Sequence, residues 1–117
     1  MQHEHIDRAI DYIEFSASDL SAIKNFYGEV FGWKFQDWGD EYASFSDGRV
    51  DGGFARSDVK VGKGALVILY STDLEEIQKK VLWAGGVITK DTFSFPGGRR
   101  FHFADPAGNE LAIWSDK

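Results

Sequence analysis

GRRFHFADPAGNELAIW, residues 98–114, is the stretch of sequence that decides the fold. Apolar and polar residues alternate on both sides of residues 105–109 (DPAGN), which is typical of two antiparallel strands joined by a turn. A weaker copy of this hairpin, EYASFSDGRVDGGF, occupies residues 41–54 around an Asp-Gly turn. Two such hairpins in one chain point to an internal duplication.

The first half of the chain predicts a strand, a helix and three further strands. A strand is expected at residues 9–17. An apolar stripe at helical spacing then covers residues 20–31, with Asp19 as its N-terminal cap and Gly32 as its stop. A strand at residues 33–38 leads into the first hairpin.

The second half of the chain repeats this order. A strand is expected at residues 66–71, followed by a helix that ends at Gly85-Gly86. A short strand at residues 87–89 and a loop at residues 93–98 precede the final hairpin. The two halves therefore predict the same set of elements in the same order.

An offset of 54 residues superimposes the two halves, bringing Asp19 onto Asp73 and Gly32 onto Gly86. Strand, helix cap, helix stop and hairpin then match in one order, which favours a true duplication. We therefore predict a single α+β domain over residues 1–117, built from two βαβββ modules. The expected boundaries are 9–56 for the first module, 57–64 for the linker and 65–116 for the second module.

Composition limits the classes of partner. The chain has 117 residues, no cysteine and a formal net charge of -6. Without a basic run, this acidic balance argues against a nucleic-acid partner. No apolar run is long enough for a membrane span, and the N-terminus lacks the apolar core of a signal peptide, so we expect a cytoplasmic protein. The ten Phe, four Trp and four Tyr can line a ligand pocket as well as fill a core.

Three segments together resemble the vicinal oxygen chelate superfamily. They are Ser18-Asp19-Leu20 after the first strand, FYGEVFGW at residues 26–33 and FADPAGN at residues 103–109. This superfamily includes glyoxalase I, extradiol dioxygenases, fosfomycin-resistance proteins and bleomycin-binding proteins. The resemblance implies a cup-shaped, mostly antiparallel eight-stranded sheet around a ligand. It also implies a homodimer, since members commonly build or cover the cup with a second chain.

Metal-using members of that superfamily take His, Glu or Gln ligands from the first and last strands of the modules. Carried onto this sequence, these positions fall on Tyr12, Leu66, Ala112 and approximately Phe54. None of the four is a usual metal ligand. A shift of two residues would offer Glu14 and Glu110, but the second-module strand would still offer only Ile68. We therefore predict a member without metal or other cofactor.

Strand alternation places the candidate binding residues on one face of each strand, and by the family analogy these faces line the cup. The candidates are Tyr12, Glu14, Ser16, Leu66, Ile68, Tyr70, Glu110, Ala112 and Trp114. Such a lining suits a small, partly apolar molecule, including a cationic one. Glu14 is the candidate catalytic residue, because a dry cup would raise its pKa and make it a general base or a charge anchor. Alternatively, Glu14 hydrogen-bonds to Tyr, Trp or Arg neighbours or lies at a wet rim.

Several further residues allow two interpretations. Glu110 directly follows the turn and is either a pocket residue or solvated. His102 lies between two phenylalanines and faces the opposite way, as a structural residue or as a ligand. Arg99 and Arg100 either clamp an anionic substrate or face solvent. Gly52-Gly53 either permits close approach of a ligand or marks a bulge.

Three functions are compatible with these features. The first is a metal-independent binding protein that sequesters a toxic or signalling compound or senses a metabolite. The second is a lyase- or dioxygenase-like enzyme, metal-dependent or acid–base, that uses Glu14, Glu110 or His102. The third is a module that regulates a partner protein, which predicts an apolar outer patch and a filled cup.

Overall fold

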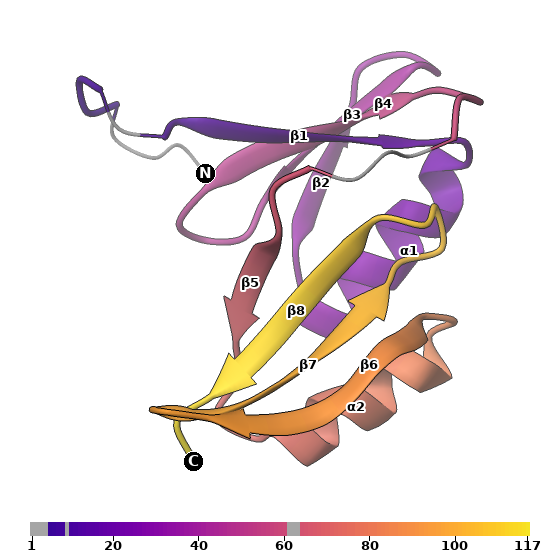
Figure 1. Ribbon diagram of the computed structural model, residues 1–117. Coiled ribbons are helices and arrows are strands. Elements are labelled where there is room, and N and C mark those ends of the chain that lie inside the picture. The colour runs from indigo at the N-terminus through magenta and orange to yellow at the C-terminus, as the bar shows by residue number, and fades with distance from the viewer. Residues whose placement is uncertain (1–4, 9, 61–63) are drawn as a thin grey trace. The chain divides into compact units, whose positions relative to one another are not determined.

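The computed structural model describes residues 5–8, 10–60 and 64–117. Two helices and eight strands occur within these residues (Figure 1). In chain order they are β1 (Tyr12–Ala17), α1 (Leu20–Phe31), β2 (Lys34–Asp37), β3 (Tyr42–Ser46), β4 (Asp51–Arg56), β5 (Val67–Tyr70), α2 (Leu74–Trp83), β6 (Val87–Phe95), β7 (Gly98–Ala104) and β8 (Glu110–Ser115). The order of strand, helix and three strands thus occurs twice.

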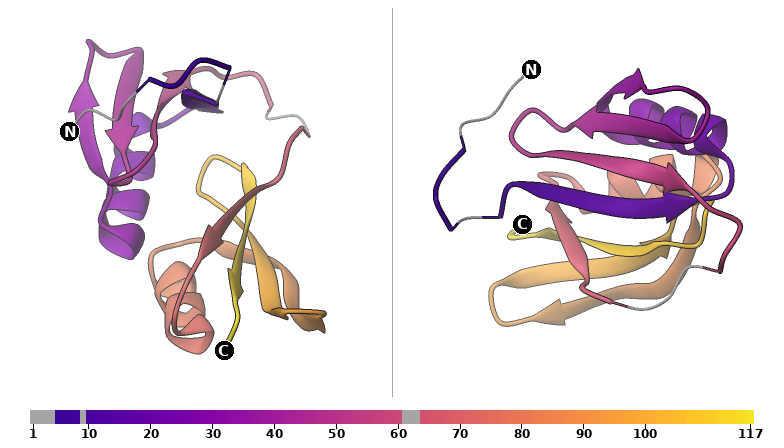
Figure 2. Two further views of the ribbon diagram at one scale, coloured as in Figure 1. Left: turned by 90° about the vertical axis from the view of Figure 1, so that its left-hand side faces the viewer. Right: turned by 90° about the horizontal axis from the view of Figure 1, so that it is seen from above.

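The described strands form two four-stranded sheets, ordered β1-β4-β3-β2 and β5-β8-β7-β6. In each sheet the first and last strands of the module pair in parallel, whereas the other ladders are antiparallel. Each helix lies against one face of its own sheet (Figure 2). The predicted α+β class, with two βαβββ modules, is confirmed.

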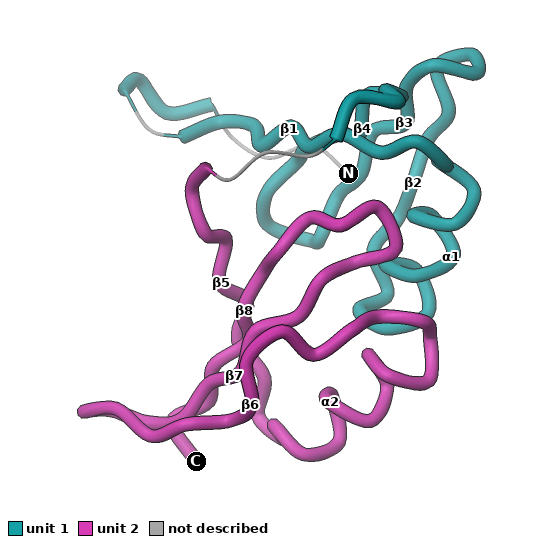
Figure 3. Tube along the Cα trace, turned by 45° about the vertical axis from the view of Figure 1, so that its right-hand side comes forward, with its two compact units in different colours: residues 1–60 teal, residues 61–117 magenta. Residues whose placement is uncertain are grey.

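The chain separates into two compact units, residues 1–60 and residues 61–117 (Figure 3). Unit 1 contains β1 to β4 with α1, and unit 2 contains β5 to β8 with α2. Ala9, the first residue of the first predicted strand, lies outside the described residues. Neither of the helices described here is long and apolar enough to cross a membrane.

Both helices begin at the predicted aspartates. The Asp19 side chain accepts a hydrogen bond from the backbone N–H of Ala22, and Asp73 accepts one from Glu76, each at 3.1 Å. Each carboxylate thereby satisfies an N–H group that the first helical turn leaves without a partner. The first helix ends at Gly32, whose positive φ of 73° suits a residue without a Cβ.

The core of unit 1 is aromatic. Tyr27 stacks on Trp33 at 4.5 Å between ring centroids, and Trp33 stacks on Phe45 at 4.4 Å. A Cβ on Gly52 would overlap the Phe45 ring and the backbone of β1. The β3–β4 register is continuous through Gly52 and Gly53, so the bulge predicted as one alternative is wrong.

The core of unit 2 is mixed. Phe101, Phe103, Leu111 and Ile113 are fully buried on one face of β7 and β8. The apolar side of α2 supplies buried residues as well, among them Leu74. Because side chains alternate along a strand, residues between these positions project from the opposite face of the sheet.

Strand β6 is longer than predicted, because it runs to Phe95 instead of ending at Thr89. The predicted loop at residues 93–98 is therefore strand over its first three residues, followed by the turn at Pro96-Gly97. The register with β7 shifts between Ile88 and Lys90 and again between Lys90 and Phe93. These irregularities, together with a polar stretch, hide the strand from an analysis of alternation.

Candidate functional site

Each sheet has one face packed on its helix and one face that carries the candidate residues. The face of unit 1 away from α1, here called the unit 1 face, includes Tyr12, Glu14 and Ser16 of β1, Tyr42, Ser44 and Ser46 of β3, and Asp51 and Gly53 of β4. Glu14 lies opposite Gly53 on β4, and Gly53 lies opposite Ser44 on β3. The sheet register thus brings β1 and β3 residues together over a glycine.

Two tyrosines and Glu14 form a hydrogen-bonded chain on the unit 1 face. The Tyr12 and Tyr42 hydroxyl oxygens are 2.6 Å apart, and the Tyr42 hydroxyl donates to Glu14 Oε1 at 2.9 Å. A Cβ on Gly53 would overlap both hydroxyl groups. Gly53 therefore makes room for the protein's own side chains.

Tyr42 is held in its protonated form. Burial raises the pKa of Tyr42 far above its ordinary value, and the hydrogen bonds with Tyr12 and Glu14 raise it further. The neutral hydroxyl remains a donor to Glu14, whose side chain is exposed instead of enclosed in a dry pocket. The expected hydrogen bond between Glu14 and a tyrosine is confirmed. The role of Glu14 as a general base stays a prediction.

A polar groove of about 250 Å³ lies along β2 and β3 in unit 1. It is lined by Lys34, Phe35, Gln36, Ser44, Phe45, Ser46 and Asp51. The Ser44 hydroxyl accepts a hydrogen bond from the Trp38 indole at 2.9 Å and donates one to the Gln36 carbonyl oxygen at 3.5 Å. Side-chain hydrogen bonds within unit 1 thus occupy much of its polar face.

The corresponding face of unit 2, here called the unit 2 face, is more aromatic and more cationic. It carries Ile68 and Tyr70 of β5, Lys90, Phe93 and Phe95 of β6, Arg100 and His102 of β7, and Glu110, Ala112 and Trp114 of β8. Ile68 and Tyr70 lie opposite Ala112 and Trp114 in the β5–β8 register. Leu66 precedes β5 and is exposed.

Aromatic rings cover one end of the unit 2 face. The Trp114 ring lies edge-on to Tyr70, with 5.2 Å between centroids, and 6.3 Å from Phe95. Tyr70 donates a 2.6 Å hydrogen bond to Asp116. This bond raises the pKa of Tyr70 and lowers the pKa of Asp116. Three of these rings form a surface on which a flat apolar molecule could pack.

The middle of the unit 2 face holds a histidine beside a carboxylate. His102 Nδ1 lies 3.4 Å from Glu110 Oε2, which also accepts a 2.9 Å hydrogen bond from Thr89. The His102 side chain is only 12% exposed. His102 Nε2 and Arg100 Nε are buried and find no hydrogen-bond partner among the described residues. Buried polar atoms of this kind call for an explanation.

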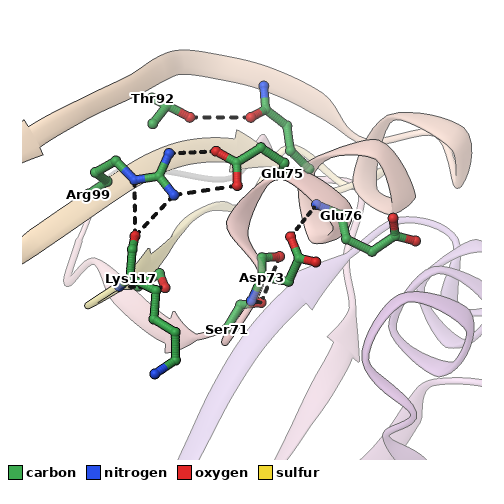
Figure 4. A network of polar contacts seen from close by, with 9 residues as sticks. Ser71, Asp73, Glu75, Glu76, Thr92, Arg99 and Lys117 are labelled. Atoms are coloured by element: carbon green, nitrogen blue, oxygen red, sulfur yellow. Dashed lines mark hydrogen bonds and ion pairs between the residues drawn. The ribbon is translucent and has the colours of Figure 1, made fainter.

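The two neighbouring arginines have different roles. Arg99 points to the helix side, where it binds the Glu75 carboxylate and the Lys117 carbonyl oxygen (Figure 4). The contact with Glu75 raises the pKa of Arg99 and lowers the pKa of Glu75. The sequence predicts that Arg99 and Arg100 either clamp a substrate or face solvent. The structure instead separates the two, and of them only Arg100 lies on the unit 2 face.

The donor set of the metal-using relatives does not fit here. The Tyr12 hydroxyl is bonded to Tyr42, and Leu66 and Ala112 carry no ligand atom. Phe54 is fully buried and stacks on Phe15, so the position equivalent to Ala112 is Gly53 instead of Phe54. No group of three or more His, Cys, Asp or Glu that could hold a metal ion occurs in the described part of the chain.

Sequence reasoning missed several members of these faces. Tyr42 was hidden inside a hairpin, although its alternation with Ser44 and Ser46 places it on one face. The sequence predicts a loop at Phe93 and Phe95, although Phe-Ser-Phe also has the period of a strand. The opposite orientation of His102 relative to Phe101 and Phe103 was predicted and is confirmed by its place opposite Ala112.

Comparison with known proteins identifies the family. A model described as the glyoxalase/bleomycin resistance protein/dioxygenase superfamily matches residues 9–113. Among curated proteins, the chain is 28% identical to the anthracycline biosynthesis protein DnrV of Streptomyces peucetius. This match covers 88% of the chain and 45% of DnrV, so the chain spans less than half the length of that relative.

Solved structures agree on the fold. A glyoxalase/bleomycin resistance protein/dioxygenase family enzyme from Burkholderia phytofirmans PsJN has a TM-score of 0.81 at 16% identity, covering 92% of this chain and 98% of that one. A mutant of the fosfomycin resistance protein FosX from Listeria monocytogenes, solved with Mn(II) and a dihydroxypropylphosphonic acid, has a TM-score of 0.80 at 13% identity. That match covers 93% of this chain and 90% of the FosX chain.

Proposed function

Since the chain belongs to the glyoxalase/bleomycin resistance protein/dioxygenase superfamily, we propose that it binds a small, partly apolar molecule without a metal ion and thereby sequesters or senses it. The observation that carries this proposal is the unit 2 face. There, aromatic rings lie beside buried nitrogen atoms that have no partner within the described residues. Rings with a few polar atoms are the usual lining of a small-molecule site.

The proposal assigns binding residues to each of the two sheet faces, each face taken by itself. In unit 2 they are Leu66, Ile68, Tyr70, Glu110, Ala112 and Trp114, and in unit 1 they are Tyr12, Glu14 and Ser16. Glu14 supplies a carboxylate anchor that Tyr42 holds in position through a 2.9 Å hydrogen bond. The proposal includes a single cytoplasmic domain that works as a homodimer, since two-fold dimers are the commonest assemblies.

A thermal-shift screen of small aromatic compounds tests the proposal. We expect a hit to raise the unfolding temperature of the wild type but not of Trp114→Ala, which removes the central ring of the unit 2 face. Trp83→Ala is the matched control, because Trp83 lies at the end of α2 and is 85% exposed. Elemental analysis and titration with Ni(II), Zn(II), Mn(II) and Fe(II) complete the test. Stoichiometric metal, or metal stabilisation that disappears in Glu14→Gln, would contradict the proposal.

A second candidate function is acid–base catalysis, favoured by the pairing of His102 with Glu110. A carboxylate 3.4 Å from one ring nitrogen orients the imidazole and leaves the other nitrogen for a substrate. The test is lactoylglutathione lyase activity with and without chelator. Activity that resists the chelator and is lost in His102→Gln would place this function first. A protein inactive in both conditions would exclude this lyase activity.

A regulatory interaction module is the remaining candidate, and it is favoured by an exposed apolar patch. Leu82, Trp83 and Val87 are 53%, 85% and 60% exposed around the end of α2. Such residues are a common feature of interaction surfaces. Sedimentation at several concentrations compares the wild type with Trp83→Ala. If the variant dimerises more weakly than the wild type, a second copy of the chain binds at this patch.

A further inference from the structure

We infer that the unit 2 face selects planar phenols, with Arg100 Nε and His102 Nε2 binding one acidic hydroxyl group of the ligand. The inference rests on the proposed function and narrows its ligand to a chemical class. The shared feature of such compounds is an aromatic ring system that carries an O–H group able to ionise near neutral pH.

The fold brings the two nitrogen-bearing side chains to the same face. Arg100 and His102 are two residues apart on β7, so both project from the side opposite the buried Phe101. They lie opposite Trp114 and Ala112 on β8. The side chain of Ala112 is a methyl group, so it cannot form a hydrogen bond with a ring nitrogen of His102.

The irregular register of β6 brings further side chains to this face. Lys90 lies opposite His102 and Phe93 lies opposite Arg100, although three positions separate Lys90 from Phe93. In a regular strand, that odd spacing would put the two on opposite faces. The register shift between them therefore places one cation and one aromatic ring beside the two β7 residues.

The Phe93 ring flanks both nitrogen-bearing groups. The Arg100 guanidinium carbon lies 5.3 Å from the Phe93 ring centroid, and the His102 ring centroid lies 6.1 Å from it. Arg100 also lies 5.8 Å from the Phe95 ring, which in turn neighbours Trp114. A flat ligand can therefore pack on aromatic rings while its edge reaches the polar atoms.

Two buried nitrogen atoms on this face lack partners in the part of the chain that the structure describes. Arg100 Nε is an N–H donor, and neither it nor His102 Nε2 has a hydrogen-bond partner within the described residues. A folded protein seldom leaves such atoms without an acceptor or donor. A ligand that supplies both an acceptor oxygen and a proton satisfies the pair, which a hydroxyl group does and an ether does not.

The neighbours of His102 determine which proton the ligand must bring. Glu110 lies 3.4 Å from Nδ1 and favours a proton on that nitrogen, which leaves Nε2 as an acceptor. A phenol can then donate its proton to Nε2. The O–H bond breaks as the N–H bond forms, the oxygen keeps the electron pair, and Glu110 balances the charge of the imidazolium.

The charge of the face favours the phenolate that results. Lys90 and Arg100 flank His102, and neither forms an ion pair with a carboxylate within the described residues. Lys90 Nζ instead lies 4.6 Å from the Phe93 ring centroid. Glu110 is the carboxylate beside His102, and Lys90 and Arg100 are its cationic neighbours on the described strands β6 and β7. An anionic oxygen is therefore stabilised here.

The test uses alizarin, a dihydroxyanthraquinone dye, and its dimethyl ether, in which both hydroxyls are capped. Alizarin absorbs at longer wavelength once a phenol ionises, so absorbance reports proton transfer and a titration reports affinity. We expect the wild type to bind alizarin at least about tenfold more tightly than the ether, with the ionised spectrum at a pH where free alizarin is neutral.

Three variants locate the effect. Arg100→Met and His102→Phe keep the bulk of each side chain and remove the nitrogen atoms. Each should lose about tenfold in alizarin affinity and leave ether affinity nearly unchanged. Arg99→Met is the matched control, since it removes the same charge from the same strand on the opposite face. Thermal unfolding checks that every variant is folded.

The outcomes separate this inference from the proposed function. Equal binding of dye and ether, weakened in Trp114→Ala, would overturn the phenol inference while supporting a small-molecule site. Binding of alizarin that Arg100→Met and His102→Phe leave unchanged would also overturn it. If neither compound binds, the phenol class is excluded, and the thermal-shift screen alone decides the proposed function.

Discussion

The two units have the same sheet order but use equivalent positions in opposite ways. The registers make Tyr42 and Ser44 of β3 equivalent to Arg100 and His102 of β7. In unit 1 both residues have side-chain hydrogen bonds, Tyr42 to Glu14 and Ser44 with its neighbours. In unit 2 both residues keep one buried nitrogen without a partner in the described residues.

The two copies of the fold therefore differ in how the polar groups on their sheet faces are satisfied. The unit 1 face satisfies its polar groups internally, which stabilises the sheet. The unit 2 face has two buried nitrogen atoms without a partner among the described residues, which costs stability and is the observation on which we base the proposed binding there. The same comparison applies to the central position, where Gly53 makes room for two tyrosines and its equivalent Ala112 lies beside His102.

We expect the largest effect on stability when Gly53 of unit 1 is replaced by alanine, the residue at the equivalent position 112 of unit 2. Gly53→Ala should lower the free energy of unfolding by about 2 kcal/mol, because the new methyl group displaces two hydroxyls and breaks their hydrogen bonds. Urea unfolding measures this loss. The reverse variant, Ala112→Gly, is the control and should cost less, about 1 kcal/mol. Equal costs would show that the tyrosine chain contributes nothing.

Removing the central hydroxyl of the unit 1 chain should have the next effect. Tyr42→Phe should lower the free energy of unfolding by about 1 kcal/mol at neutral pH, through loss of the hydrogen bond to Glu14. The raised pKa of Tyr42 adds a pH dependence. The unfolded chain ionises near the ordinary value of 10.0 while the folded chain does not, so wild-type stability falls as pH rises above that value.

Phenolate absorbance and urea unfolding between neutral and alkaline pH measure both parts of this prediction. The variant should lose less stability than the wild type above the ordinary tyrosine pKa. Tyr70→Phe is the comparison in unit 2, because the pKa of Tyr70 is also raised, but mainly by its hydrogen bond to Asp116 instead of by burial. A parallel fall in wild type and Tyr42→Phe would contradict the burial argument.

The equivalent change in unit 2 should have the opposite sign. Arg100→Met removes a buried N–H that has no partner among the described residues, a group that costs about 1–3 kcal/mol. It also removes contacts of the cation with Phe93 and Phe95, worth about 0.5–1 kcal/mol. At the central values of these ranges the first effect is larger, so the variant should be more stable by about 1 kcal/mol. Thermal and urea unfolding check the sign, and a loss of stability would mean that Arg100 serves the fold.

The sequence predicts the modules because their signals are local. Asp19 with Gly32 and residues 105–109 with their flanking alternation define helix and hairpin without help from distant residues. The strand faces follow from the same alternation, so Tyr12 with Glu14 and Ala112 with Trp114 were assigned to shared faces correctly.

The contents of the two faces could not be predicted in full, because they depend on strand register. The hydrogen-bonded chain needs Tyr42 to meet Glu14 across β4, and only the pairing of three strands decides this. The place of Phe93 depends on irregularities in β6 that break the alternation. Which nitrogen atoms lack partners is likewise a property of packed side chains, as Arg100 shows.

The smallest effect concerns how each helix is held to its sheet. In unit 2, Arg99 binds Glu75 and the Lys117 carbonyl oxygen, and the pKa of Glu75 is lowered from its ordinary value of 4.5. In unit 1, Lys24 pairs with Asp37 at 2.8 Å. Glu75→Gln should reduce stability slightly at neutral pH, since exposed ion pairs contribute little.

Because the folded pKa of Glu75 is lower than its ordinary value, the stability that the ion pair contributes is present above pH 4.5 and is lost as pH falls through the folded pKa. Urea unfolding of wild type and Glu75→Gln should therefore converge in acid, with Asp37→Asn as the control in unit 1. A difference that persists below both pKa values would show that Glu75 acts by packing instead of charge.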